Sequence, residues 1–422
     1  MSGKKFCEVE KVLSCKQRIS LVITKEKICW IVVAIFWILE NITPHSTISQ
    51  ISMIVMAGVL GIYCFSHKRI KMSPVSCSYM LLIVLQFVYW SFGAVMDRNV
   101  TGSNLQTMII CLVCSILIYS FLSLKGTNDK IGTFLIYTGL ISLLTVMWLC
   151  RNSLFTGRMA HAYGKDAVSY YFLGRPVGIS SNSIATYSCF GFIFSLIKYS
   201  NEKKVKWLVY DAVFLVGIIL TGSRKGLLMM GAFWIIYELI IKKNRDVVLK
   251  AIGIILAVLA GYIIVTSVPA LRNIIGERLE ELIVNKLTGK AVSEGSITAR
   301  ARYASYAVEI IKHKYLLGNG LGWFKSVYGN VTENNYYELL VGCGIFGLLV
   351  NYSFVPNAIR LMFIHKKNAY CLAMGMVLIV LLIIEWGSVE YLSWDTIIYK
   401  SLFYLAVSQR KNRRTNGEII YD

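Results

Sequence analysis

Two adjacent cations, Arg224 and Lys225, stand between glycines in the segment Thr-Gly-Ser-Arg-Lys-Gly, which begins at Thr221. Glycine lets a backbone approach a ligand closely, and the N-terminus of the apolar helix expected next adds positive potential. Such a turn suits an anion, phosphate above all. We therefore predict an anion site at this turn, with Ser223 as a further binding residue. The alternative is that both cations only reach lipid phosphates.

A second cationic pair, Arg300 and Arg302, lies in a long polar segment of the sequence. Arginine binds phosphate with two parallel hydrogen bonds, whereas lysine offers a point charge. A charged helix face is more often solvated or in contact with lipid headgroups, so this pair becomes a candidate site through its neighbours. Arg302 is our candidate catalytic cation of the two, and Arg300 a supporting one.

A carboxylate and two amides, Glu333-Asn334-Asn335, precede Tyr336 where an apolar stretch begins. At the edge of a low-dielectric region, we expect burial to raise the pKa of Glu333 and make it a general base. The alternative is that Glu333 caps the following helix and complements its dipole. Asn334, Asn335 and Tyr336 are candidate substrate-binding residues beside it.

A basic segment containing Arg175 leads into another apolar stretch at Asn182. Asn182 either caps that helix or hydrogen-bonds a sugar. Both residues are kept as candidate substrate-binding residues.

Lys400 lies in the middle of an apolar stretch, where a charged side chain needs a partner. Glu385 and Glu390, at the ends of neighbouring stretches, are weaker candidate functional residues, chosen by position only. An intramembrane lysine is also typical of transporters, so Lys400 is the best argument for a transport function.

No metal or cofactor is expected. None of the 11 cysteines falls in the long outward segments, where oxidation would act, and Cys111 and Cys114 lack partner ligands. The glycines at 318, 320 and 322 resemble a dinucleotide-binding motif, but no strand precedes them.

The elements that position these residues follow from composition. The chain has 422 residues, of which 56% are hydrophobic and 16% charged, whereas soluble domains carry about 25% charged residues. A membrane span needs roughly 20 mostly apolar residues. The sequence therefore predicts an all-α polytopic membrane protein with about twelve spans: 28–43, 46–66, 74–96, 105–124, 131–150, 180–198, 205–222, 226–241, 248–268, 336–355, 369–387 and 394–408.

The distribution of charge predicts the orientation of these spans. With both termini cytoplasmic, the cytoplasmic segments hold 27 Lys and Arg against 8 Asp and Glu, which is most of the net charge of +21. Basic cytoplasmic loops are what the positive-inside rule requires. The charge therefore records membrane insertion and gives no evidence for nucleic acid.

The domain organisation follows from the spans. Residues 1–27 and 409–422 are cytoplasmic tails, 28–268 hold spans one to nine with an outward loop at 151–179, and 336–408 hold spans ten to twelve. Residues 269–335 form a large outward loop with an amphipathic helix at 297–315, predicted to lie on the outer surface. Its apolar face is predicted to comprise Ile297, Ala301, Ala304, Val308 and Ile311.

The order of these motifs resembles the O-antigen ligase and polymerase superfamily, which includes the Wzy-type polymerases of surface polysaccharide. The run Ser223-Arg224-Lys225-Gly226 is similar to the family's Gly-Ser-Arg-Gly turn, with a lysine inserted. Arg302 followed by Tyr306 and a glycine-rich turn is similar to the family's outer-loop arginine, although Arg300 also fits.

The family's His-Asn motif before a leucine-rich helix resembles Glu333-Asn334-Asn335-Tyr336, with Glu333 in the place of histidine. In the ligases that histidine is the proposed base, so the glutamate weakens a ligase assignment and is compatible with a polymerase in which a carboxylate has the same role.

The resemblance implies a GT-C-like fold and a bacterial cytoplasmic-membrane enzyme acting on the outer face. It implies polymerisation of polyprenyl-diphosphate-linked oligosaccharides into O-antigen or capsule, with Glu333 as base and Arg224 and Arg302 stabilising the leaving diphosphate. Implied partners are the lipid-linked donor and acceptor, a chain-length regulator and a flippase. The alternatives are ligase-type transfer of finished polymer, and a flippase or transporter.

Overall fold

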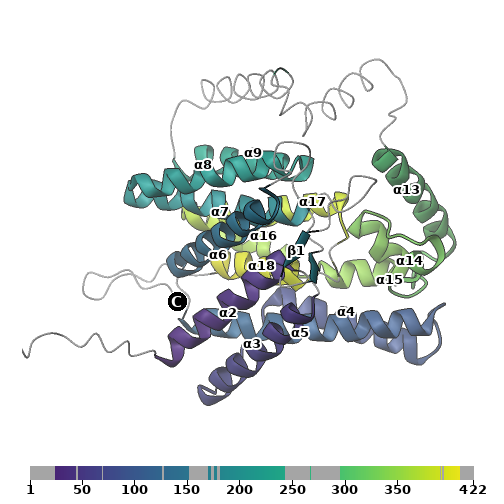
Figure 1. Ribbon diagram of the computed structural model, residues 1–422. Coiled ribbons are helices and arrows are strands. Elements are labelled where there is room, and N and C mark those ends of the chain that lie inside the picture. The colour runs from purple at the N-terminus through teal and green to yellow at the C-terminus, as the bar shows by residue number, and fades with distance from the viewer. Residues whose placement is uncertain are drawn as a thin grey trace, which may run out of the picture.

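The computed structural model describes residues 24–43, 46–68, 70–125, 128–151, 170–172, 175–177, 181–242, 267, 295–389, 391 and 394–408 (Figure 1). These residues are almost entirely helical. The helices of the first half are α2 (Lys25–Ile42), α3 (Thr47–Ser66), α4 (Pro74–Ser91), α5 (Arg98–Lys125), α6 (Asn128–Leu149), α7 (Ser181–Glu202), α8 (Val205–Leu220) and α9 (Arg224–Ile236), which continues as the π-helix η2 (Tyr237–Ile241).

The second half contributes α13 (Gly295–His313), α14 (Trp323–Tyr328), α15 (Asn335–Asn351), α16 (Val355–Ile364), α17 (Ala369–Ile384), the short 3₁₀-helix η4 (Glu385–Gly387) and α18 (Trp394–Ser408). Two three-residue strands, β1 (Tyr170–Phe172) and β2 (Arg175–Val177), pair antiparallel. Eleven of the twelve predicted spans coincide with helices in the described residues, and the ninth, 248–268, lies outside them apart from residue 267. The β1–β2 pair is a small correction to the all-α prediction.

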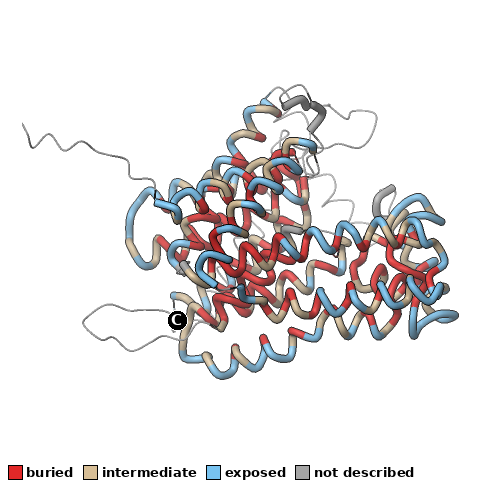
Figure 2. Tube along the Cα trace, turned by 90° about the horizontal axis from the view of Figure 1, so that it is seen from below, coloured by how far each residue is buried: buried red, intermediate tan, exposed pale blue. Residues whose placement is uncertain are grey.

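The chain is a helical membrane protein. Among the residues that the structure describes, six helical segments are long and apolar enough to cross a membrane: Thr47–Ser66, Pro74–Ser91, Arg98–Leu124, Asp129–Leu149, Asn335–Ile364 and Ala369–Gly387. Large apolar side chains on their outer faces are exposed, such as Ile54 at 68% and Ile62 at 76%, as expected of surfaces that lie against lipid. Figure 2 shows buried residues inside the bundle and exposed ones around it. The sidedness of the loops, and the count of twelve spans, stay predictions.

The central helix of the bundle is α18. Every residue from 397 to 407 is buried, which is typical of a helix surrounded by others. The Tyr399 ring packs on Trp37 of α2 and Phe190 of α7, with ring centroids 5.3 and 4.2 Å apart. Because α18 is enclosed on all sides, any charge on it must find its partner inside the protein.

The helix predicted at 297–315 is present as α13, but only part of its predicted apolar face is packed: Ile311 contacts the buried cluster that includes Ala307. Ala301 and Val308 are exposed, whereas Ala307 is fully buried. Ala307 packs with Phe324 of α14 and Val341 of α15, so the packed face is rotated from the predicted one. The partner of the helix, and not its hydrophobic pattern, determines which side is covered.

Candidate functional site

The turn between α8 and α9 is built by its small residues. Gly222 adopts φ +58°, a left-handed conformation that glycine enters at little cost. Ser223 is the N-cap of α9: its hydroxyl accepts a hydrogen bond from the Gly226 backbone N–H at 3.2 Å. The same hydroxyl donates to Asn182 Oδ1 of α7 at 2.7 Å. The structure thus brings together two predicted binding residues, Ser223 and Asn182, and confirms a helix N-terminus at Arg224.

Gly226 serves the packing of helices, which is a correction to its predicted role toward a ligand. A Cβ added at Gly226 would lie 2.5 Å from the Cβ of Ala185 on α7. The space beside this glycine is therefore filled by protein. Only glycine allows α9 to lie this close to α7, and that contact fixes the direction in which Arg224 and Lys225 leave the turn.

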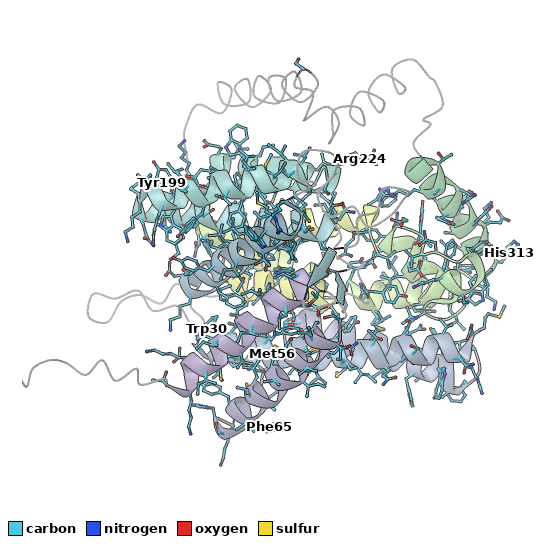
Figure 3. The ribbon with its side chains drawn as sticks, viewed as in Figure 1. Trp30, Met56, Phe65, Tyr199, Arg224 and His313 are labelled. Atoms are coloured by element: carbon cyan, nitrogen blue, oxygen red, sulfur yellow. The ribbon has the colours of Figure 1, made fainter. Side chains whose placement is uncertain are left out.

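Lys225 ties the turn to the end of α17. Its Nζ donates to the hydroxyl of Ser388, which follows η4, at 3.0 Å. Arg224 lies beside it on the first turn of α9, and Figure 3 shows Arg224 at the end of α9 that faces α13. The two cations therefore stand at a helix N-terminus whose dipole favours an anion.

Asn334, and not Glu333, caps α15. The Asn334 side-chain oxygen accepts from the backbone N–H groups of Tyr336 at 2.9 Å and Tyr337 at 3.2 Å. Glu333 precedes the cap with φ +61°, a conformation uncommon outside glycine. The alternative prediction for Glu333, a capping role, is therefore wrong.

The Glu333 carboxylate instead faces α13. Its Oε2 lies 3.4 Å from Arg300 Nη2, and the two side chains are 34% and 41% exposed. Both side chains of the pair are thus accessible to solvent, and the Glu333 carboxylate is less buried than predicted. An exposed ion pair of this kind stabilises a protein by only about 0–1 kcal/mol. The pair therefore contributes little to the free energy of unfolding.

Arg302 points elsewhere on α13. It is exposed, and its guanidinium carbon lies 5.4 Å from the ring centroid of Tyr303. Tyr306, the aromatic of the predicted motif, stacks on Tyr328 with centroids 4.9 Å apart. Of the two predicted arginines, the structure places Arg300 against the start of α15.

The glycine-rich turn docks α13 and α14 onto α15. Gly318 and Gly320 have φ values of +73° and +102°. The backbone N–H groups of Asn319 and Gly320 donate to the carbonyls of Val341 and Gly342, each at 2.8 Å. A Cβ at Gly318 would lie 2.6 Å from the Gly342 backbone. These glycines position α13, and with it Arg300, beside Glu333, which agrees with rejecting a dinucleotide site.

Asn335 lies inside the protein. Its side-chain nitrogen donates to Tyr352 Oη at 2.9 Å and to Glu385 Oε2 at 2.8 Å. Its side-chain oxygen accepts from the Tyr391 backbone N–H at 3.1 Å. Because Asn335 is fully buried, these hydrogen bonds fix the first turn of α15.

Sequence reasoning missed the pairing of Glu385 with Lys400. The two side chains form a buried ion pair, with 2% and 8% of their surfaces exposed, and the Tyr352 hydroxyl also donates to Glu385. The sequence does show a lysine and a glutamate in successive apolar spans. It does not show whether the two residues lie at the same depth along the packed helices. The pairing supplies the partner that Lys400 needs.

Tyr336 is half-buried and held in place. Its hydroxyl donates to the Leu382 carbonyl at 2.6 Å, and its ring stacks on Tyr352 with centroids 5.2 Å apart. Arg175 lies in β2, but its side chain, like Glu390, falls outside the described part of the structure.

The site as a whole spans three elements. The end of α17 contacts the cationic turn through Ser388 and the start of α15 through Glu385. One short segment, Glu385–Ser388, therefore contacts both the cationic turn and Asn335, which lies two residues after Glu333.

Residues 208–352 match the model of a protein family described as O-antigen ligase. Over these residues the chain is similar to the O-antigen ligase family. The match covers the cationic turn, α13 and the start of α15, and it confirms the resemblance to the O-antigen ligase and polymerase superfamily. It leaves out Asn182, Glu385 and Lys400. No curated protein matches the chain.

Proposed function

We propose that this protein polymerises polyprenyl-diphosphate-linked oligosaccharide repeat units into surface polysaccharide, on the outer face of the cytoplasmic membrane. A hydroxyl of one sugar attacks the anomeric carbon at the reducing end of a lipid-linked oligosaccharide. The new glycosidic C–O bond forms as the C–O bond to the diphosphate breaks. The polyprenyl diphosphate leaves with the electron pair, and the hydroxyl loses its proton to a base.

The observation that carries the proposal is the connection of cations and carboxylate through Glu385–Ser388. Lys225 contacts Ser388, and Asn335, next to the cap of α15, contacts Glu385. Glu333 precedes that cap and pairs with Arg300. Glycosyl transfer from a diphosphate needs both a site for the leaving anion and a base for the acceptor hydroxyl, and these are the two kinds of group that the segment joins.

Arg224 and Lys225 are proposed to hold the leaving diphosphate. Fixed cations at a helix N-terminus stabilise charge that develops in the transition state, which is usually the largest catalytic contribution. Ser223 and Asn182 support them, since their hydrogen bond at 2.7 Å holds the cap from which the cations project. Arg302 is proposed as an additional cation toward the diphosphate.

Glu333 is proposed as the base that takes the proton from the acceptor hydroxyl. Its ion pair with Arg300 orients the carboxylate while leaving it 34% exposed. A positioned base typically contributes about 10²–10⁴-fold to the rate.

A ligase is the second candidate, because the matching family is described as O-antigen ligase. A ligase would use the same leaving group and transfer a finished polymer to a different acceptor. The glutamate in the place of the family's histidine weakens the ligase alternative and is compatible with a polymerase.

One experiment tests both. The purified protein is incubated with the lipid-linked repeat unit, and the products are separated by length. A ladder of lengths is expected. One transfer to a different acceptor would establish the ligase, and unchanged substrate with every acceptor would refute both.

A further inference from the structure

Trp386 is exposed although its surroundings are fixed. It is the central residue of η4, and 62% of its surface is accessible. The residue before it, Glu385, is buried in the pair with Lys400, and Ser388, two residues after it, accepts from Lys225 at 3.0 Å. The backbone that carries the indole is therefore anchored from both sides, at the segment that joins the two parts of the proposed site.

Two tyrosines of α15 pack against the indole. The ring centroids of Tyr336 and Tyr337 lie 5.9 and 5.7 Å from that of Trp386, at interplanar angles of 43° and 54°. Tyr336 is itself held by its hydrogen bond to Leu382 and its stacking on Tyr352. A rigid aromatic group of this kind loses little conformational entropy when a ligand packs on it.

The groups around this aromatic surface are polar. Tyr336 and Tyr337 come two and three residues after the cap Asn334, and Glu333, just before the cap, pairs with Arg300 at 3.4 Å. An apolar surface bordered by a few placed hydrogen-bonding groups is the usual form of a small-molecule site. A pyranose ring has the matching shape, with C–H groups on its face and hydroxyls at its edge.

We propose that Trp386, backed by Tyr336 and Tyr337, is the surface on which a sugar of the oligosaccharide substrate stacks. The proposal rests on the proposed function, because it names where the substrate of that site is bound. Trp386 takes no part in bond making or breaking. It holds the sugar chain beside Glu333 and the cations, so it governs the concentration at which substrate saturates the enzyme.

The competing role for an exposed tryptophan is an anchor at the membrane interface. The two roles differ in what they require of the side chain. Stacking needs an aromatic ring and is partly preserved by phenylalanine, whereas partition toward lipid is retained by leucine.

The first measurement is the binding of lipid-free oligosaccharides, released from the host's surface polysaccharide by mild acid, to the purified full chain by saturation-transfer NMR. We expect wild type and Trp386→Phe to bind, and Trp386→Leu to bind roughly five- to tenfold more weakly. Trp148→Leu is the matched control, because Trp148 is also exposed, at 68%, at the end of α6. Loss of binding in that control, equal binding by Trp386→Leu, or no binding by the wild type would overturn the proposal.

The second measurement is turnover of the lipid-linked repeat unit by the same variants. We expect Trp386→Leu to raise KM by a similar factor while kcat changes less than twofold. A fall in the amount of folded, membrane-inserted protein with KM unchanged would identify an interface anchor and overturn the stacking role. If the wild type binds the oligosaccharide but makes no product, the polymerase proposal fails while the stacking surface stands.

Discussion

Two charged pairs near the start of α15 differ in their surroundings: Glu333 of the first precedes the helix, and Glu385 of the second is bound by Asn335 in its first turn. Glu333 and Arg300 form an exposed pair at 3.4 Å, with a third or more of each side chain accessible. Glu385 and Lys400 form a buried pair, to which Asn335 and Tyr352 add hydrogen bonds. The first pair can open to a substrate at little energetic cost. The second can lose a partner only by leaving a charge in the membrane interior.

The comparison separates the groups that act from the groups that hold them. Asn335 belongs to the buried network, and the adjacent Asn334 caps the helix that presents Glu333. The buried network thus fixes the position of the exposed one. Changes in the buried pair are expected to appear first in stability, and changes in the exposed residues in turnover.

The largest effect is expected from breaking the buried pair. Lys400→Ala leaves Glu385 buried without its cation, so we expect the free energy of unfolding to fall by about 3–5 kcal/mol. The double substitution Glu385→Gln with Lys400→Met removes both charges and should recover most of that loss. Thermal unfolding in detergent measures both. If the double variant were no more stable than Lys400→Ala, the buried charge would not be the cause.

Removing the proposed base should lower turnover without this loss of stability. Glu333→Gln keeps the size of the side chain, and we expect kcat to fall by about 10²–10⁴-fold while the unfolding temperature stays within a degree or two. The assay is the length ladder formed from the lipid-linked repeat. Glu309→Gln is the control, because Glu309 is also an exposed acid. It lies on α13 and pairs with Lys312. Unchanged turnover by Glu333→Gln across pH would assign Glu333 a role in positioning Arg300 only.

Substitution of the proposed cations tests whether they stabilise the leaving diphosphate. Arg224→Ala and Arg302→Ala are each expected to reduce turnover by about 10²–10³-fold, as loss of one preorganised donor does elsewhere, and single lipid-linked repeats should accumulate in cells. Lys312→Ala on α13 should leave chain lengths unchanged. Because the structure places Arg300, and not Arg302, against Glu333, an active Arg302→Ala alongside an inactive Arg300→Ala would move the catalytic role to Arg300.

The helices could be predicted from the sequence because apolar length is a local property. The start of α9 at Arg224 could be predicted too, since Gly222 and Ser223 are local turn and cap residues. The pairing of Glu385 with Lys400 could not, because it depends on the relative height of two helices in the folded bundle. The same holds for the role of Gly226, whose neighbour Ala185 lies 41 positions earlier in the chain.

Local reasoning also chose the wrong residue at the start of α15. Glu333 was a candidate cap because acids complement the helix dipole. The short Asn334 side chain reaches the N–H groups of Tyr336 and Tyr337, and Glu333 then turns outward at φ +61°. On α13, part of the predicted face was wrong for a different reason: the docking partner, α14 and α15, covers Ala307 instead of Val308.

The smallest effect is expected from the cap that joins the exposed pair to the buried one. Asn334→Ala removes the acceptor for two backbone N–H groups, and caps of this kind contribute about 1 kcal/mol. Asn334→Asp and Asn334→Ser retain an acceptor and should restore most of the stability. Because Glu333 directly precedes the cap, we expect Asn334→Ala to lower kcat more than its loss of stability accounts for. Thermal unfolding and turnover measured on the same preparations decide this. If turnover fell only in proportion to the folded fraction, the cap would stabilise α15 without positioning the base.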